Sequence, residues 1–109
     1  MTVRTFTDFQ DRTLRLTDER WSHVLSHPEH DESTLRRIVE TVRDPDRVVR
    51  SRTDNTVTLL YRWYDRTPVT SKYLCVVTKT ETTDPFIITA YFTDAIKKGK
   101  TLWSRPNAP

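Results

Sequence analysis

The stretch Thr17–His30, TDERWSHVLSHPEH, predicts a short capped helix immediately before a half of the chain that is rich in strand-forming residues. Thr17 is a favourable N-cap, because its hydroxyl can accept a hydrogen bond from a backbone N–H of the first turn. The two carboxylates that follow it favour the positive end of the helix dipole. Pro28 disfavours helical geometry at the residue before it, so we expect the helix to cover residues 18–26.

Two histidines, His23 and His27, stand four residues apart, a spacing that places residues on one helix face, and His27 is the last residue of the helix or just past it. The apolar residues fall on the other side and are Trp21, Val24 and Leu25. Histidine changes its charge near neutral pH, which suits proton transfer to or from an anionic substrate. The spacing makes a metal-free ribonuclease a hypothesis to test against the rest of the chain. His30 follows in the loop and is expected at the surface.

The elements around this helix predict a mixed fold. A second helix is expected over residues 32–43, with an amphipathic stripe formed by Leu35, Ile38, Val39 and Val42. The segment Val3–Thr17 alternates around a polar break and predicts a hairpin or two short strands. Turn residues then separate four predicted strands, at residues 47–52, 56–64, 71–80 and 86–93. The expected fold is α+β, with the hairpin and two helices packed on one face of a roughly four-stranded antiparallel sheet.

The alternation within the strands predicts which side chains face the helices. In the last strand, the side under the helices is expected to hold Phe86, Ile88, Ala90 and Phe92, and the other side Ile87, Thr89, Tyr91 and Thr93. In residues 56–64, the expected core set is Val57, Leu59, Tyr61 and Trp63. That choice places Arg62 on the open face. The strand over residues 71–80 is apolar on both sides and is expected to be central, with Lys72 on either face.

Length and composition predict one compact domain. The 109 residues suit a single domain over 1–109, and residues 104–109 are expected to form a frayed tail. No apolar run is long enough to span a membrane, and residues 1–12 contain no apolar signal region. Cys75 is the single cysteine, so no intrachain disulfide forms and a cytoplasmic location is expected. The single glycine excludes a glycine-rich phosphate loop.

The net charge of +3 is too small to identify a nucleic-acid-binding protein, but its distribution is uneven. Through Asp54, ten Lys and Arg stand against eleven Asp and Glu, a balance of −1. From Asn55 onward eight stand against four, a balance of +4, and the excess includes the run Lys97–Lys100. A basic surface attracts phosphate. The same lysines are equally suited to a solvated tail or to keeping a sheet edge soluble.

Metal-free RNA cleavage needs a base for the 2′-hydroxyl proton, an acid for the leaving 5′-oxygen and a cation for the crowded phosphorane. His23 and His27 suit the first two tasks, and the bidentate donors of arginine suit the third. The candidate catalytic residues are His23, His27, Arg62, Tyr91 and Thr93, and the candidate substrate-binding residues are Lys72, Thr89, Lys97 and Lys98. No cofactor is expected.

Each candidate also has an ordinary structural explanation. A histidine on an exposed helix is often plain polar surface, and one at a helix end favours the C-terminal dipole. Arg62 is equally suited to pairing with Asp65 or stacking on an aromatic ring, and Tyr91 to a cluster with Tyr61 and Tyr73. A His-x3-His pair also binds zinc, but a site needs a third ligand and the intervening proline bends the chain, so we expect no metal.

The order of these features resembles the phage-associated branch of the barnase–EndoU–colicin–RelE-like nuclease superfamily. The matching segments are DERWxHxLxHPE near the front, LYRWY and KYLCVV in the centre, and TAYxTDxIKKG near the end. The resemblance covers about residues 9–103. Because this superfamily changes its catalytic residues, the resemblance implies a fold more strongly than a site.

The resemblance implies a metal-independent endoribonuclease that acts on RNA as a toxin, an effector or a mobile-element enzyme, with a protein inhibitor or antitoxin as a further partner. It implies a helix histidine, here His23 with His27, and a basic strand residue, here Arg62 or Lys72. The last-strand hydroxyl would come from Thr89, Tyr91 or Thr93. The alternative is a non-catalytic RNA-binding or protein-interaction module on the same scaffold. The sequence leaves the oligomeric state open.

Overall fold

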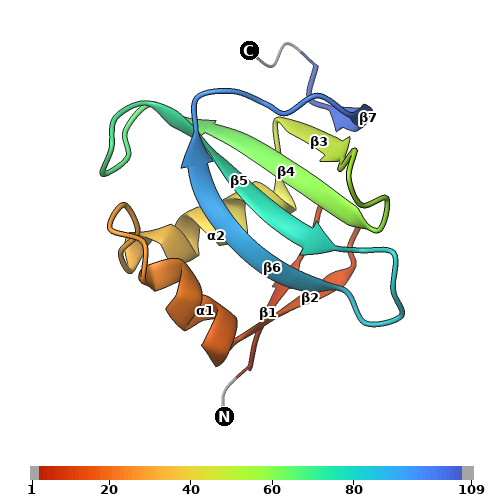
Figure 1. Cartoon of the computed structure of the whole chain (residues 1–109), viewed down its shortest axis with the longest axis horizontal. Coiled ribbons are helices and arrows are strands. Elements are labelled where there is room, and N and C mark those ends of the chain that lie inside the picture. The colour runs from red at the N-terminus through yellow and green to blue at the C-terminus, as the bar shows by residue number, and fades with distance from the viewer. Residues whose placement is uncertain (1–2, 107–109) are drawn as a thin grey trace.

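The computed structural model describes residues 3–106, which form two helices and a seven-stranded mixed sheet (Figure 1). The strands are β1 (Val3–Thr7), β2 (Thr13–Thr17), β3 (Arg47–Arg50), β4 (Val57–Tyr64), β5 (Lys72–Lys79), β6 (Phe86–Thr93) and β7 (Lys100–Ser104). The helices are α1 (Asp18–Leu25) and α2 (Ser33–Arg43). Both helices lie within one residue of their predicted bounds, because caps and apolar spacing are local signals. The Thr17 hydroxyl caps α1 by accepting from the Arg20 backbone N–H at 3.3 Å.

The sheet has the strand order β1-β2-β6-β5-β4-β3-β7. The central strands β4, β5 and β6 form long antiparallel pairs. The N-terminal hairpin joins the sheet through a short parallel contact, in which Arg15 of β2 lies beside Phe86 of β6. At the other end, β7 pairs antiparallel with β3. The sheet therefore extends beyond the central meander on both sides.

Both helices cover one face of the sheet, and the larger core lies beneath them (Figure 1). Its fully buried members are Leu14, Leu16, Val24, Ile38, Val42, Val48, Leu60, Leu74, Val76 and Ile87. These side chains come from both helices and from β2 to β6, so burial of apolar surface fixes the helices to the sheet. Neither helix within residues 3–106 has the length and apolar character needed to cross a membrane.

A second, smaller core lies on the opposite face of the sheet, which we call the second face. Its buried members are Val49, Val57, Leu59, Tyr61 and Cys75, with Tyr73, Val77, Ile88, Tyr91 and Ile96 packed against them. The segment between β6 and β7 covers part of this face. Ile96 packs there, and the Lys97 backbone N–H donates to the Tyr61 hydroxyl at 3.1 Å. Strands β4 and β5 are consequently buried on both sides.

The prediction of a roughly four-stranded antiparallel sheet was wrong. The sheet has seven strands and is mixed, although the fold remains α+β with two helices. Two long-range pairings account for the difference. The N-terminal hairpin joins β6, and residues 100–104, expected to contain the start of a tail, add to the edge of β3. Such pairings depend on partners distant in the sequence, which local alternation does not encode.

Two predictions of side-chain facing were also wrong. Leu60, not Leu59, belongs to the core beneath the helices, and Arg62 points to that same side, where it contacts Asp44 at the end of α2. In β6 the register shifts opposite the Val77/Thr78 step of β5. This irregularity places Ile87 beneath the helices and Ile88 toward the second face, the reverse of the expected order. Ala90 and Phe92 do pack beneath the helices.

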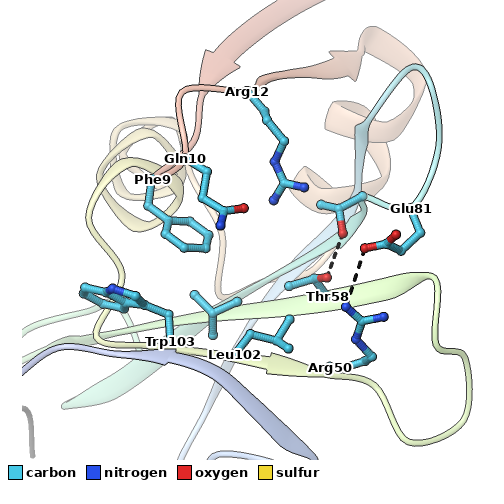
Figure 2. Close-up of a pocket in the computed structure, with 10 residues that line it drawn as sticks. Phe9, Gln10, Arg12, Arg50, Thr58, Glu81, Leu102 and Trp103 are labelled. Atoms are coloured by element: carbon cyan, nitrogen blue, oxygen red, sulfur yellow. Dashed lines mark hydrogen bonds and ion pairs between the residues drawn. The ribbon is translucent and has the colours of Figure 1, made fainter.

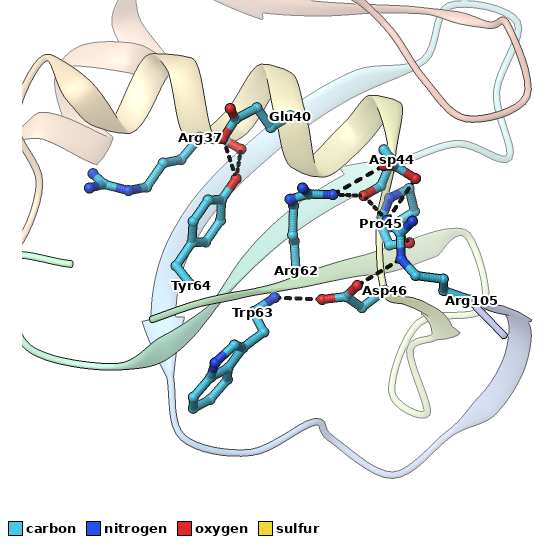
Figure 3. A network of polar contacts seen from close by, with 9 residues as sticks. All are labelled: Arg37, Glu40, Asp44, Pro45, Asp46, Arg62, Trp63, Tyr64 and Arg105. Atoms are coloured by element: carbon cyan, nitrogen blue, oxygen red, sulfur yellow. Dashed lines mark hydrogen bonds and ion pairs between the residues drawn. The ribbon is translucent and has the colours of Figure 1, made fainter. Parts of the chain in front are cut away.

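The C-terminal strand is held by specific contacts. The Arg105 Nε donates to the Asp46 carboxylate at 2.9 Å, and the same carboxylate accepts from the Trp63 backbone N–H at 2.7 Å (Figure 3). Gly99 lies where a Cβ atom would come 2.3 Å from the Arg50 carbonyl oxygen, so only glycine fits this close approach. Of the predicted tail, Ser104 belongs to β7, and residues 107–109 lie outside the described residues.

Candidate active site

The exposed side of α1 carries the two predicted histidines. His23 lies in the last turn of the helix and His27 lies two residues after its end. Their ring centroids are 5.6 Å apart, and the rings are nearly perpendicular. Both side chains are exposed to solvent. The two imidazoles therefore lie close together in the folded chain, as expected, and a ligand from solution can reach them.

A hollow of about 510 Å³ opens beside His23, between α1 and β6. Its other lining residues are Thr17, Glu19, Arg20 and Ile88. The Arg20 guanidinium lies over the Phe86 ring, 5.0 Å from its centroid, and donates to the Ile88 carbonyl oxygen at 3.4 Å. The ring and the carbonyl hold this cation next to His23. An imidazole, a carboxylate and a guanidinium thus line one open hollow.

His30 is not a surface residue, contrary to expectation. It is 6% exposed, and its Nε2 lies 3.0 Å from the Ala90 carbonyl oxygen. A carbonyl only accepts, so Nε2 carries the proton and the neutral ring accepts at Nδ1 from the Thr34 hydroxyl at 3.2 Å. Burial lowers the pKa of His30, an effect that the Ala90 hydrogen bond opposes. His30 therefore ties the loop between the helices to β6.

Arg62 is occupied by an ion pair away from the histidines. Its Nη1 donates to the Asp44 carbonyl oxygen at 2.6 Å and to the carboxylate at 3.3 Å (Figure 3). Arg105 contacts the same carboxylate at 2.6 Å. Although desolvation acts in the opposite direction, hydrogen bonds from Arg105 and Arg62 lower the pKa of Asp44. Asp44, not the predicted Asp65, is the partner of Arg62, and the contact anchors the end of α2.

Three further candidates lie on β5 and β6, two of them at strand ends. Lys72 begins β5 and forms an ion pair of 2.5 Å with Asp94. Thr93 ends β6, and its hydroxyl donates to the Ala95 carbonyl oxygen at 3.1 Å. Thr89 pairs with Val77 in the middle of the same two strands. The contacts of Lys72 and Thr93 organise the turn that leaves β6.

Tyr91 lies on the second face, in a cluster with Tyr61 and Cys75. Its hydroxyl is buried, and burial raises the pKa of Tyr91, as do the neighbouring thiol and the Tyr61 phenol. Burial also raises the pKa of the Cys75 thiol to about 11. Lys97 lies over the Tyr91 ring, with Nζ 5.8 Å from the centroid. Tyr91, Lys97 and Lys98 line a second hollow of about 470 Å³.

The predicted site residues thus occupy separate places. His23 lies on α1 and His27 just after its end, on the helix-bearing side, whereas Tyr91 lies on the second face with Lys97 and Lys98. Arg62 of β4 contacts Asp44 at the end of α2. The ion pair of Lys72 with Asp94 lies where β5 begins and β6 ends. The nine residues do not converge on one site. The groups that do line a common hollow with His23 are Glu19 and Arg20.

Glu19 and Arg20 were not predicted as site residues, although their spacing signals the arrangement. Glu19 precedes His23 by four residues and Arg20 precedes it by three, so both lie on the same side of a helix as His23. The prediction attributed the carboxylates of the first turn to the helix dipole and looked for the cation on the sheet. Helical periodicity alone could have identified both.

Neither metal ligands nor relatives define the site further. Among residues 3–106, no three His, Cys, Asp or Glu side chains gather closely enough to hold a metal ion. Comparison of the chain with protein-family models, with curated proteins and with solved structures gave no match. The resemblance to the nuclease superfamily stays a prediction, and any function has to be argued from the side chains themselves.

Proposed function

We propose that this protein is a metal-independent endoribonuclease with its reacting groups on α1 and just after its end. The observation that carries the proposal is the pair of exposed imidazoles, His23 and His27, 5.6 Å apart, of which His23 lines a hollow together with Arg20 and Glu19. This combination supplies two groups of the type used for proton transfer and a cation for phosphate. In this proposal, Arg20 of α1 takes the role that was expected of basic residues on the strands.

In the proposed reaction, one histidine removes the proton of the 2′-hydroxyl, and the other protonates the leaving 5′-oxygen. The 2′-oxygen forms a bond to phosphorus as the bond to the 5′-oxygen breaks, which leaves a 2′,3′-cyclic phosphate and a 5′-hydroxyl. Arg20 stabilises the negative charge that develops on the phosphorane. Glu19 lines the same hollow as His23 and Arg20. No metal ion takes part in this sequence.

The direct test incubates the purified protein with a 5′-labelled single-stranded RNA in EDTA. We expect cleavage products that end in a 2′,3′-cyclic phosphate. His23→Ala and His27→Ala should each lower the rate by about 10²–10⁴-fold, the usual contribution of a positioned acid or base. Arg20→Ala should lower it by about 10²-fold or more.

Arg36→Ala is the matched control for Arg20→Ala, because Arg36 is an exposed arginine on α2, away from the hollow beside His23. This variant should retain the full rate. Cleavage that persists unchanged in the double variant His23→Ala/His27→Ala contradicts the proposal. Absence of cleavage at high protein concentration contradicts it as well.

A second candidate function, RNA binding without cleavage, is favoured by the hollow on the second face. Lys97, Lys98 and Arg52 line this hollow above an apolar floor, and cations beside an aromatic ring are typical of single-strand binding surfaces. This function predicts salt-sensitive RNA binding without turnover. Lys97→Ala and Lys98→Ala would weaken binding, and His23→Ala would leave it unchanged.

A further inference from the structure

A third hollow lies away from both surfaces described above, between the β1–β2 turn and the β3–β7 edge of the sheet (Figure 2). Its volume is about 330 Å³, at the lower end of the range typical of small-molecule sites. It is lined by Phe9, Gln10, Arg12, Val48, Arg50, Thr58, Thr80, Glu81, Leu102 and Trp103. Neither histidine of α1 contributes to it.

One side of this pocket is aromatic and apolar. The Phe9 and Trp103 rings lie 5.9 Å apart, tilted by 47°, and Leu102 lies next to them (Figure 2). Aromatic faces and an aliphatic side chain suit the flat surface of a ring, on which stacking is favourable. The Phe9–Trp103 contact joins the β1–β2 turn to β7, so the pocket is formed only by the folded chain.

The other side of the pocket offers hydrogen-bond donors. The Arg12 Nε is fixed by the buried Asp8 carboxylate at 2.9 Å, which leaves its two terminal nitrogens directed toward the pocket (Figure 2). The Arg50 Nε is buried, and no protein atom within residues 3–106 accepts a hydrogen bond from it. A buried donor without an acceptor is unfavourable. A ligand with an acceptor atom would remove that cost.

Acceptors and hydroxyls complete the polar side. The Thr58 and Thr80 hydroxyls are buried and share a hydrogen bond of 2.7 Å. The Glu81 carboxylate lies 3.5 Å from Arg50, and the Gln10 amide points into the same space (Figure 2). The pocket therefore offers both donors and acceptors around an apolar wall.

The charges of the pocket are balanced, which decides the kind of ligand. Arg12 is paired with Asp8 and Arg50 with Glu81, so each cation has its own carboxylate. A bare anion such as phosphate would meet two guanidinium groups whose charges Asp8 and Glu81 already balance. An uncharged planar ring with donors and acceptors on its edge matches the balanced charges, the aromatic wall and the volume of the pocket.

We propose that this pocket binds a nucleobase, stacked against Trp103 and hydrogen-bonded at its edge by Arg12, Arg50 and Glu81. The base comes either from a free nucleoside or from single-stranded RNA, since the recognising chemistry is the same. The site does not rest on the ribonuclease proposal, because none of its residues belongs to α1. Binding should therefore persist in His23→Ala/His27→Ala, whether or not the wild-type chain cleaves RNA.

The test titrates the full chain with adenosine, guanosine, cytidine and uridine by calorimetry and follows the tryptophan indole N–H resonances. At least one nucleoside should bind saturably and shift the Trp103 resonance. Inorganic phosphate should neither bind nor compete. A short single-stranded RNA that binds tenfold or more tightly than the nucleoside supports a base within RNA as the occupant, and equal affinity supports the free nucleoside.

Two variants and one control make the test specific. Trp103→Leu should weaken binding by about tenfold, the usual effect of removing one stacking partner. Glu81→Gln, a change at an exposed carboxylate, should weaken it by about fivefold. Trp63→Leu is the control, because Trp63 is a partly exposed tryptophan outside the pocket, and it should have no effect.

Several results would overturn the proposal. These are no nucleoside binding up to about 10 mM, displacement of the nucleoside by phosphate, or equal weakening by Trp63→Leu and Trp103→Leu. Glu81→Gln also keeps the test decisive if Trp103→Leu destabilises β7. Unchanged nucleoside affinity in Glu81→Gln would contradict the assigned edge contact.

Discussion

The two faces of the sheet are built from the same strands but differ in construction. Beneath the helices, Leu60, Val76 and Ala90 of β4, β5 and β6 form a purely apolar layer that α1 and α2 close. On the second face, the adjacent positions Tyr61, Cys75 and Tyr91 form a layer with polar atoms, which the segment before β7 covers only in part.

This difference explains where ligands can reach the molecule. Where α1 and α2 cover the apolar layer no ligand has access, so His23 stands on the outer surface of α1. Beyond the helices, the same face opens into the pocket lined by Phe9, Val48 and Trp103. The second face is closed by a loop and retains a hollow lined by Tyr91 and Lys97. Ligands therefore reach the helix-bearing face only beyond its helices, and the second face beside the loop that covers it.

The sharpest test of this contrast substitutes adjacent leucines of β4. Leu60→Ala should destabilise the protein by about 4 kcal/mol, because a fully enclosed cavity remains beneath the helices. Leu59→Ala should cost about 2 kcal/mol, because Leu59 already borders the hollow of the second face and its loss mainly enlarges that space. Urea unfolding of both variants measures the difference. Equal losses would contradict the distinction between a sealed face and an accessible one.

A second test acts on the cover of the second face. Gly99→Ala should destabilise the protein by about 2 kcal/mol, because the new Cβ would collide with the Arg50 carbonyl oxygen and the Val49 side chain. Lys98→Ala is the control, since Lys98 is exposed one residue earlier. Urea midpoints report the change, and Tyr91 should become more accessible in ultraviolet absorbance. A Gly99→Ala chain as stable as Lys98→Ala would show that the segment is loosely attached.

A third test uses pH on the helix-bearing face. The pKa of His30 is lowered by burial, so below pH 6.5 the unfolded chain binds more protons than the folded one. The free energy of unfolding should therefore be constant above about pH 6.5 and fall as the pH decreases toward the lowered pKa, by at most about 1.4 kcal/mol per pH unit. His30→Gln should remove this slope. The slope should survive in His23→Gln, and its loss there would contradict the assignment.

The smallest effect concerns the thiol of the second face. With its pKa raised to about 11, Cys75 should react with iodoacetamide at pH 8 about a hundredfold more slowly in the folded chain than in urea. Mass spectrometry over time measures both rates. Fast alkylation of the folded chain would show that the second face opens readily to solvent. Cys75→Ala should change stability by only about 1 kcal/mol.

Prediction from the sequence succeeded where the signal is local. The cap at Thr17 and the apolar stripe of residues 33–43 located the helices, and the turns located β4, β5 and β6. Prediction failed for the face of the sheet to which strand side chains point and for the order in which the strands pair. Alternation in β4 offers two apolar sets, one with Leu59 and one with Leu60, and both prove to be buried. The pattern could not say which set the helices would cover.

In the candidate site too, the local feature was predictable and the contacts between distant residues were not. The sequence by itself determined that His23 and His27 lie close together, because four residues make about one helical turn. Only the tertiary structure decided that His30 is buried against Ala90 and that Arg62 pairs with Asp44. Helical neighbours are set by bonds along the chain, whereas partners across a sheet are set by strand order and register, which depend on packing of the whole molecule.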